Sequence, residues 1–405
     1  MTYIKRAIES VIQQSTRDFP VVVLTGPRQS GKTTLLKHVF GNSHAYVSLE
    51  PPDVQAAAIT DPRGFLAVHA PPVIMDEIQY APALLPYIKE WVDSHRAASG
   101  QYLLTGSQNL LLLEKVSESL AGRAAVLHLL PLSLREQVGD IDVPFPWETD
   151  SPRSIHRDIT YNRLWKTIVR GSYPELVAAP EKDASLWYAS YVQTYLERDV
   201  RSLRQIGDLT TFQSFVRALA ARSGGLLNMS EVARDIGVAV NTAKAWLSVL
   251  EATHQVFILR PYFANVGKRL VKSPKLYFTD VGMLCYLTGI KDHAHAAAGP
   301  LSGAILETAV LTEIIKTYYH RGEQPRVYFW RTASGTEVDI VIDTGNSLIP
   351  IEVKLSATPR PRMAQGIVAL RKTLGDKVHH GYVVHPGDVS LPIAPGVTAI
   401  PFAAL

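Results

Sequence analysis

Five short apolar runs, each bounded by glycine, proline or polar residues, recur between residues 21 and 140. In chain order they read VVVLTG, AYVSL, PVIMDE, QYLLTGS and AVLHLLPL, and segments with helical spacing separate them. Runs that are apolar throughout are typical of parallel strands buried on both faces of a sheet. The pattern therefore predicts an N-terminal α/β domain built on a parallel sheet.

Two breaks interrupt the hydrophobic pattern further along the chain. The first, from Ile141 to Asp158, is rich in proline and mixed charge, and the second, KDHAHAAAGPLSG, begins at Lys291. Between the breaks the spacing of apolar residues is mostly helical, whereas a compact α/β pattern follows the second break to the C-terminus. We therefore expect three domains, at residues 1–140, 141–290 and 291–405.

Composition narrows the class of protein. Hydrophobic residues make up 46% of the 405 residues and charged residues 19%, a balance that supports large buried cores. The net charge of +4 suits an acidic partner such as nucleic acid but is too small to establish one. Cys285 is the single cysteine, so no intrachain disulfide can form. No segment approaches the ~20 apolar residues that span a bilayer. We predict a soluble cytoplasmic protein with no membrane partner.

A phosphate-loop pattern, GPRQSGKT, lies between the apolar run VVVLT and the helical run TTLLKHVF. Backbone N–H groups of such a loop cradle phosphate oxygens at the start of a helix, Lys32 neutralises the β- and γ-phosphates, and Thr33 holds magnesium. The pattern predicts an ATP site with Mg²⁺ as its metal. The expected nucleotide-binding residues are Gly26, Pro27, Arg28, Gln29, Ser30, Gly31, Lys32, Thr33 and Thr34.

Two adjacent acids follow the apolar run PVIM about forty residues after the phosphate loop. Asp76 is expected to orient water bound to magnesium. Glu77 is expected to polarise the water that attacks the γ-phosphate. An acid pair after a strand is usually a solvated strand end, but the preceding phosphate loop favours the catalytic interpretation.

Two further candidates for the ATP site come later in the N-terminal domain. The run QYLLTGS ends in Thr105, Gly106 and Ser107, and a hydroxyl there, with Ser107 as our choice, could sense the γ-phosphate; the alternative is an ordinary strand end. Arg123 could stabilise transition-state charge, either in its own subunit or in a neighbouring one, or be a solvated surface arginine. The neighbouring-subunit alternative would require a homo-oligomer.

The motifs GPRQSGKTTLL, PVIMDEIQ, LLTGSQ and SLAGR resemble the AAA-type ATPase domain of a large prokaryotic group of ATP-binding proteins that carry a C-terminal domain of unknown function. The resemblance continues through GSYPE, YLERDV, PKLYFTDVG, RTASGTEVD and IEVK, and so covers nearly the whole chain. It implies a P-loop AAA-type ATPase domain, then a helical winged-helix-like domain and a small α/β restriction-endonuclease-like domain.

A helix-turn-helix pattern extends from Asn228 to Thr253, with Ser230 and Asn241 as expected N-caps. Residues at the start of its second helix would meet base edges, and a basic hairpin wing after it would contact the DNA backbone. The expected DNA-binding residues are Asn241, Thr242, Lys244, Lys268, Arg269 and Lys272; Arg260 and Lys275 lie in the same basic segment. Alternatively, the module packs within the protein or contacts another protein.

Carboxylates alternate with apolar residues in TEVDIVID, and IEVKL follows nearby. If the two strands are neighbours, Asp339, Glu352 and Lys354 converge, and two carboxylates with a lysine can bind Mg²⁺ and activate water for attack on a phosphodiester. Glu307 could add a further metal ligand. The arrangement resembles the PD-(D/E)xK nuclease fold, although charges also alternate on ordinary half-exposed strands. Arg331 is either a phosphate contact or part of a surface salt bridge.

These patterns lead to one main hypothesis and one alternative. The main hypothesis is an ATPase whose ATP state controls DNA binding and, through the C-terminal module, metal-dependent DNA cleavage. The alternative is a regulatory ATP switch that binds a protein partner and has no nuclease activity. Salt-sensitive DNA affinity would favour the first, because neutralisation of phosphates weakens as salt is added.

Overall fold

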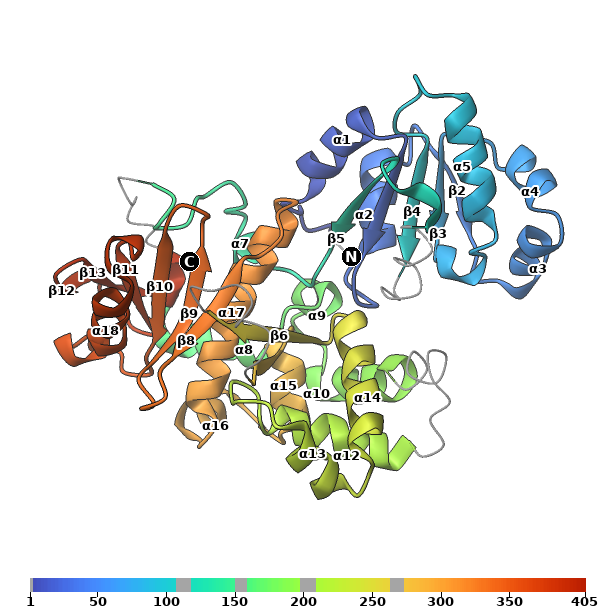
Figure 1. Cartoon of the computed structure of the whole chain (residues 1–405). Helices are drawn as coiled ribbons and strands as arrows, with labels where there is room; N and C mark the ends of the chain where they lie inside the picture. The colour runs from blue at the N-terminus through green and yellow to red at the C-terminus, as the bar shows by residue number, and fades with distance from the viewer. Residues whose placement is uncertain (1–2, 107–117, 150–158, 197–208, 263–272) are drawn as a thin grey trace.

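A computed structural model of the chain describes residues 3–106, 118–149, 159–196, 209–262 and 273–405. It contains a five-stranded sheet in the N-terminal part and an eight-stranded sheet in the C-terminal part, with a group of helices between them in the sequence (Figure 1). None of the helices in the described part of the chain has both the length and the apolar character needed to cross a lipid bilayer.

The N-terminal sheet is parallel and has the strand order β2-β3-β4-β1-β5, which confirms the five strands expected from the apolar runs. All five residues of β1 are buried, because helices cover both faces of the sheet. The strands are β1 Val21–Thr25, β2 Ala45–Ser48, β3 Val73–Asp76, β4 Tyr102–Gly106 and β5 Ala124–His128. The helices are α1 Glu9–Asp18, α2 Lys32–Phe40, α3 Pro52–Thr60, α4 Pro62–Val68, η1 Ile78–Tyr80 and α5 Leu84–Ser94.

The middle of the chain is mostly helical, as its hydrophobic spacing predicts. Its helices are α7 Leu134–Val138, α8 Tyr161–Arg170, α9 Pro174–Ala178, α10 Ala184–Tyr191, η2 Val192–Leu196, α12 Leu209–Ala220, α13 Met229–Ile236, α14 Val240–Ala252, α15 Val281–Leu287 and α16 His293–Ala298. The expected N-caps are wrong: Asn228 caps α13 by accepting from two backbone N–H groups, and α14 follows Ala239 without a side-chain cap. Asn228 precedes Ser230 and has the better-placed side-chain oxygen.

The C-terminal sheet has the strand order β12-β13-β11-β10-β9-β8-β6-β7. Its strands are β6 Val256–Pro261, β7 Lys275–Phe278, β8 Val327–Arg331, β9 Glu337–Asp343, β10 Leu348–Val353, β11 Gly381–His385, β12 Leu391–Ala394 and β13 Val397–Pro401. The hairpin of β6 and β7 pairs through β6 with β8, so this sheet extends across the expected boundary at residue 290. One hydrophobic core spans the same boundary, with members from Leu130 to Leu405.

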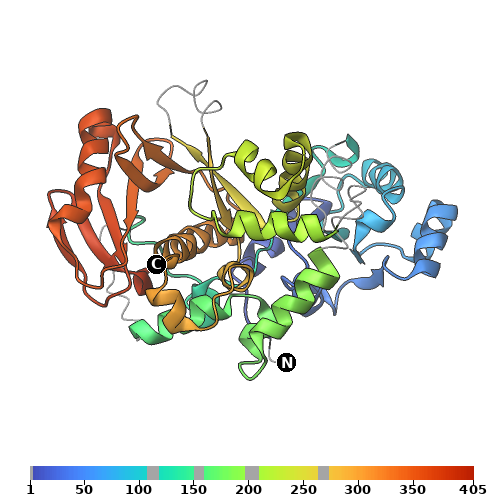
Figure 2. The ribbon, with the colours of Figure 1, turned by 90° about the horizontal axis from the view of Figure 1, so that it is seen from below.

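Two longer helices accompany the C-terminal sheet. Helix α17, Ser302–His320, contacts both β10 of this sheet and β5 of the N-terminal sheet. In two perpendicular views it lies between the two parts of the molecule (Figure 1 and Figure 2). Helix α18, Gln365–Leu374, packs on β9 and β10, and η4 Pro361–Ala364, η5 Gly375–Lys377 and η6 Phe402–Ala404 are short turns.

Candidate functional site

The phosphate loop connects β1 to α2, in the strand-loop-helix order that the sequence predicts. Gly26 and Gly31 have φ values of 152° and 95°, in a region that side chains disfavour. A Cβ atom on Gly26 would lie 2.1 Å from the carbonyl oxygen of Leu129. The close approach of the loop to the chain after β5 therefore requires glycine at this position.

Lys32 begins α2 and is buried. Its Nζ donates to the carbonyl oxygens of Gly26 (3.0 Å) and Pro27 (2.9 Å), both in the loop itself. The ammonium is thus held against the phosphate loop. There it can replace its hydrogen bonds to these two carbonyl oxygens with hydrogen bonds to phosphate oxygens.

The side chain of Asp76, at the end of β3, accepts hydrogen bonds from three hydroxyls. Thr33 Oγ1 donates to Asp76 Oδ1 (2.9 Å) and Oδ2 (3.0 Å), Tyr46 OH donates to Oδ2 (3.0 Å), and Thr105 Oγ1 donates to Oδ1. Burial first, and then the Asp76 charge, raise the pKa of Tyr46 to about 12. Thr33 and Asp76 thus meet as a hydroxyl and a carboxylate, the oxygen ligands that Mg²⁺ prefers.

Glu77 lies directly after β3 with left-handed backbone angles, φ 59° and ψ 52°. Its N–H donates to Thr105 Oγ1 at 3.0 Å, and the amide of Gln79 donates to its carboxylate. The left-handed turn directs Glu77 to the lining of a cavity next to the phosphate loop. Thr105 thus contacts both acids, whereas Ser107, our choice for a γ-phosphate sensor, lies outside the described residues and that role stays a prediction.

The cavity has a volume of about 690 Å³, within the range of roughly 300–1,000 Å³ found for small-molecule sites. Its polar end is formed by the loop and the start of α2, and its other walls come from the N-terminal segment and from α9. The lining residues include Tyr3, Ile4, Arg6, Arg28, Gln29, Gly31, Lys32, Thr33, Thr34, Glu50, Glu77, Leu132, Pro174, Glu175 and Ala178. Six of the nine expected nucleotide-binding residues are among them.

Arg123 lies away from this cavity. It forms a bidentate ion pair with Asp93 of α5, through Nε (2.7 Å) and Nη2 (3.0 Å). It also donates to the carbonyl of Ala121. The hydrogen bond from Arg123 lowers the pKa of Asp93. Within one chain, therefore, the structure does not bring Arg123 to the phosphate loop.

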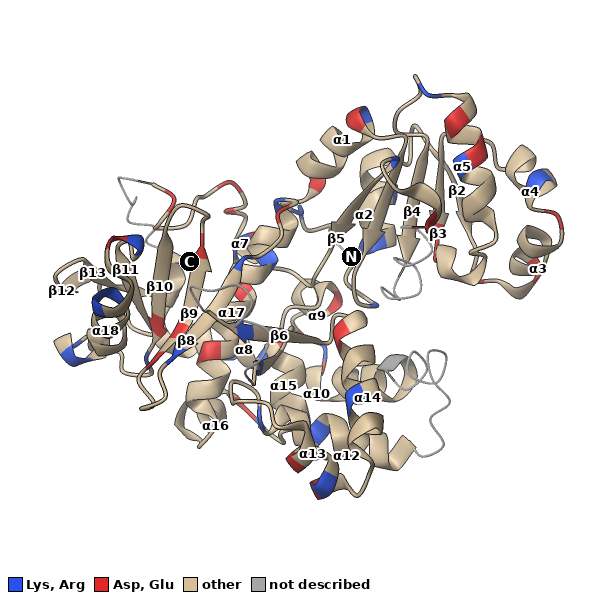
Figure 3. Ribbon diagram, viewed as in Figure 1, with Lys and Arg blue, Asp and Glu red and all other residues tan. Residues whose placement is uncertain are grey.

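The expected C-terminal acids do converge on one face of β9 and β10. Asp339 Oδ2 accepts from the backbone N–H of Val353 (2.8 Å) and lies 3.6 Å from Lys354 Nζ, which also donates to Glu352. The antiparallel pairing that sets Ile351 opposite Ile340 produces this arrangement. Acidic and basic residues lie side by side there in Figure 3.

Glu307, from α17, joins the same acids but binds a lysine that the sequence suggested for DNA. Lys275 Nζ lies 3.0 Å from Glu307 Oε1 and also pairs with Glu337. Because Lys275 is buried in these ion pairs, it cannot belong to an exposed basic wing, and that expectation was wrong. We call Lys275, Glu307, Glu337, Asp339, Glu352 and Lys354 the carboxylate cluster.

Burial makes the carboxylate cluster hard to ionise fully. Burial first, and then the nearby Asp339 charge, raise the pKa of Glu352 to about 9 and that of Glu307 to about 7. Among the residues that the structure describes, no three acid, histidine or cysteine side chains are grouped as a metal centre requires. A metal ion here would have to displace protons or lysine contacts, so the metal role of Glu307, Asp339 and Glu352 stays a prediction.

The structure describes three of the six residues that we expect to bind DNA. Asn241 and Lys244 are exposed at the start of α14 and Thr242 is half-buried, whereas Lys268, Arg269 and Lys272 lie outside the described residues. Arg331 forms an ion pair with Glu337 (3.0 Å), as in the salt-bridge alternative. The winged-helix and nuclease-like folds stay predictions.

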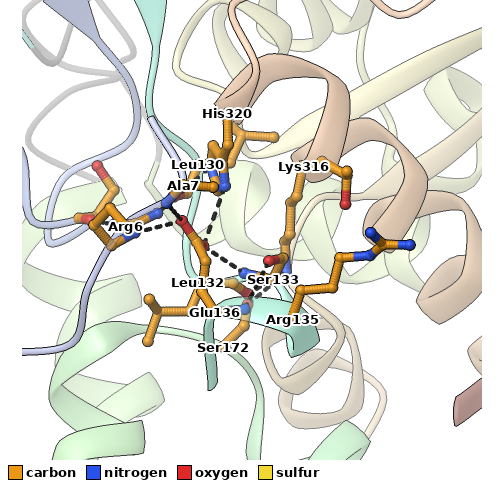
Figure 4. Close-up of polar contacts among 12 residues, drawn as sticks. Arg6, Ala7, Leu130, Leu132, Ser133, Arg135, Glu136, Ser172, Lys316 and His320 are labelled. Carbon is orange, nitrogen blue, oxygen red and sulfur yellow. Dashed lines mark hydrogen bonds and ion pairs between the residues drawn. The ribbon is translucent and has the colours of Figure 1, made fainter. Parts of the chain in front are cut away.

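A buried set of ionisable residues next to the phosphate loop was not predicted from the sequence. Arg6, Glu136 and His320, which we call the Arg6 cluster, come from the N-terminal segment, α7 and α17 (Figure 4). The available signal was the spacing of Glu313, Lys316 and His320, which places three ionisable residues on one face of a largely apolar helix.

Comparisons with known families divide the chain in the same order as the sequence patterns. Residues 18–138 match an AAA domain, residues 161–294 a domain of unknown function (DUF8612), and residues 302–405 a domain of unknown function (DUF4143). The N-terminal match agrees with the parallel sheet and phosphate loop. The expected AAA-type ATPase domain and C-terminal domain of unknown function are thus confirmed.

Whole-length relatives are found among bacterial proteins. Uncharacterized proteins of Mycobacterium tuberculosis (Rv2008c) and Mycobacterium bovis (Mb2031c) are each 31% identical over 400 residues, covering 98% of this chain and 83% of theirs. An uncharacterized protein of Haemophilus influenzae is 22% identical over 332 residues, 77% of this chain and 78% of its own. Among solved structures, a Walker-type ATPase of Pyrococcus abyssi has a TM-score of 0.42 at 14% identity, covering 69% of this chain and 94% of that chain.

Proposed function

The chain belongs to the same family as these two mycobacterial proteins, and because its N-terminal part is an AAA domain, we propose that it is a magnesium-dependent ATP hydrolase. The observation that carries the proposal is the meeting of Thr33 Oγ1 with both carboxylate oxygens of Asp76, at 2.9 and 3.0 Å, beside the phosphate loop. A hydroxyl and a carboxylate from two different elements of a P-loop domain are the protein ligands that hold Mg²⁺ on ATP.

Each element of the site has a distinct task in this proposal. Backbone N–H groups of the loop and the N-terminus of α2 receive the phosphates, and Lys32 exchanges the carbonyls of Gly26 and Pro27 for phosphate oxygens. Thr33 and Asp76 would hold Mg²⁺, which supplies charge neutralisation when it is bound. Glu77 orients the attacking water and accepts its proton, while Thr105 fixes the backbone of Glu77 relative to Asp76.

Magnesium-dependent ATP turnover by the purified full-length protein tests this function. Lys32→Ala should reduce turnover at least about 100-fold, because it removes a charge that stabilises the transferring phosphoryl group. Lys89→Ala, on α5 of the same domain, is the matched control and should retain turnover. Wild-type protein without ATPase activity, or equal activity in both variants, would exclude this assignment.

We further propose that ATP state controls the binding and metal-dependent cleavage of DNA. The convergence of Asp339, Glu352 and Lys354 on adjacent strands supports cleavage, and exposed Asn241 and Lys244 at the start of α14 support DNA contact. A salt-sensitive stimulation of ATP turnover by double-stranded DNA would support DNA as the effector. A rate of ATP turnover that is the same with and without DNA would favour the alternative, an ATP switch that binds a protein partner.

Cleavage itself requires a separate assay. Magnesium-dependent nicking of plasmid DNA should disappear in Asp339→Ala and persist in Asp343→Ala, which changes an acid at the far end of the same strand. Nicking that survives Asp339→Ala would show that the carboxylate cluster does not perform it.

A further inference from the structure

The Arg6 cluster joins the phosphate loop to α17 through buried contacts (Figure 4). Arg6 Nη1 donates to the carbonyl of Ser30 in the loop (2.9 Å), and Nη2 donates to the carbonyl of Leu130 (2.7 Å). Arg6 Nε donates to Glu136 Oε1 at 3.0 Å, and the other carboxylate oxygen lies 3.1 Å from His320 Nδ1. A single arginine thus contacts the nucleotide loop and the acid that binds the end of α17.

Helix α17 reaches this region with one polar face. Glu313 accepts the backbone N–H of Leu134 (2.7 Å), and Lys316 Nζ donates to the carbonyl of Leu132 (3.2 Å) and to Ser172 Oγ (2.7 Å). Glu313 and Lys316 thus bind the start of α7 and the segment before it, and His320 lies against Glu136 within α7. The C-terminal half of α17 is therefore fixed to the N-terminal domain by directional bonds as well as by apolar packing.

Hydrogen-bond chemistry assigns the charge state of the Arg6 cluster. Arginine can only donate, and Arg6 Nη2 lies 3.4 Å from His320 Nε2, so that nitrogen accepts and Nδ1 carries the proton that faces Glu136. Burial lowers the pKa of His320, which favours the neutral ring. Burial alone would raise the pKa of Glu136, but the Arg6 charge and the hydrogen bond from the His320 ring outweigh it and hold that pKa well below the usual range. The cluster contains one cation, one anion and a neutral ring with a defined orientation.

The loop depends on this cluster because Ser30 lies between the residues that receive phosphates. Arg6 also lines the nucleotide cavity, and a Cβ atom on Gly31 would lie 3.7 Å from Arg6 Nη1. Losing His320 would deprive both Glu136 and Arg6 of a partner in a buried site, where such a loss shifts the remaining groups. Movement of Arg6 would then displace the Ser30 carbonyl and the neighbouring loop amides.

We propose that Arg6, Glu136 and His320 are positioning residues for the phosphate loop, and that the docking of α17 thereby sets the affinity for nucleotide. This inference rests on the proposed ATP site and adds its regulation by the C-terminal part of the chain. The coupling is reciprocal, because a helix that favours nucleotide binding is itself held more firmly once nucleotide is bound. Helix α17 also carries Glu307 of the carboxylate cluster, 13 residues and about 20 Å before His320.

Titration calorimetry with ADP and Mg²⁺, on full-length protein, tests the proposal. His320→Leu should weaken ADP binding about tenfold, because two polar contacts to charged groups are lost. His320→Gln should recover part of the affinity, since an amide can donate to Glu136 or accept from Arg6. His385→Leu is the matched control: His385 is equally buried, but its ring nitrogens bond to Gly387 and Val389 in the loop after β11, so ADP affinity should stay at the wild-type value.

The outcomes separate this proposal from the ATP site itself. Wild-type protein that binds no nucleotide would remove the proposed function and this inference together. Wild-type affinity in His320→Leu, or an equal loss in His385→Leu, would overturn the inference and leave the ATP site intact. If His320→Leu does not fold, Glu136→Gln decides instead, because Glu136 joins Arg6 to His320 without lining the cavity, and its loss of charge should also weaken ADP binding.

Hydrogen exchange supplies a readout of the reverse coupling. ADP should slow amide exchange in residues 130–136 and in the last turn of α17 in wild-type protein, and this protection should shrink in His320→Gln. Unchanged exchange at α17 upon saturation with ADP would contradict the coupling.

Discussion

The phosphate loop and the carboxylate cluster are both polar regions of the molecule, and they are built in opposite ways. The loop consists of consecutive residues between β1 and α2 and opens onto a cavity of about 690 Å³. The cluster gathers side chains from β7, α17, β9 and β10, and its lysines lie against its own acids. The first region is arranged to receive a ligand, whereas the second satisfies its charges internally.

This difference distinguishes a site that local sequence determines from one that depends on the whole fold. Glycines and the strand-loop-helix order set the path of the phosphate loop within a few residues, and distant residues such as Arg6 adjust its position. The cluster depends on strand register and on the long connection from β7 to β8. The phosphate loop can accept ATP when Lys32 replaces its hydrogen bonds to loop carbonyls, whereas cleavage at the cluster requires that ion pairs first be exchanged for a metal.

The largest expected effect tests whether the cavity performs chemistry. Glu77→Gln should lower ATP turnover by roughly 100- to 10,000-fold, because an amide cannot accept the proton of the attacking water. ATP affinity should stay near the wild-type value, since Glu77 is not expected to hold the phosphates. Steady-state turnover and nucleotide binding measure the two effects, with Glu90→Gln on α5 as the control. Normal turnover in Glu77→Gln would mean that another group activates water.

The next effect concerns stability and addresses the cluster. Lys275→Met should destabilise the fold by about 3 kcal/mol, because it removes the buried cation that half-buried Glu307 and Glu337 share. Lys377→Met, at an exposed position of the same domain, should have little effect. Urea unfolding measures both. Adding Glu307→Gln to Lys275→Met should recover part of the loss, and a cost no larger than that of the control would show that Lys275 is not a structural counter-ion.

Much of the fold could be predicted from the sequence, and the reasons for the exceptions are physical. Buried strands such as VVVLT can be recognised by their continuous apolar runs, and alternation correctly placed Glu337 and Asp339 on the face opposite Val338. Lys275 was wrongly placed in an exposed basic wing, because a lysine in a strand is expected to face solvent. Its partners Glu307 and Glu337 lie far along the chain, so the sequence alone does not show that they bury it. The Arg6 cluster unites residues more than 300 positions apart, and no local pattern reports such a pairing.

A smaller effect should appear in the pH dependence of stability. The pKa of Glu352 is raised by burial from 4.5 to about 9, so the folded protein holds a proton that the unfolded chain has lost across this window. Stability should therefore fall as pH rises from about 5 to about 9, because the folded protein holds this extra proton across that range. Glu352→Gln should flatten the dependence in urea unfolding without divalent cations. Parallel curves for both proteins would show that Glu352 is ionised in the fold.

The smallest expected effect asks whether the ATP site is complete within one chain. Arg123 is committed to Asp93 and lies away from the cavity, so Arg123→Ala should leave ATP turnover unchanged if each chain works alone. Arg63→Ala, which removes another exposed ion pair of the same domain, is the control. A loss of turnover confined to Arg123→Ala, together with wild-type turnover that rises with protein concentration, would instead place Arg123 in a neighbouring subunit's site. In that case the phosphate loop, unlike the carboxylate cluster, would need a second copy of the chain to supply its full charge.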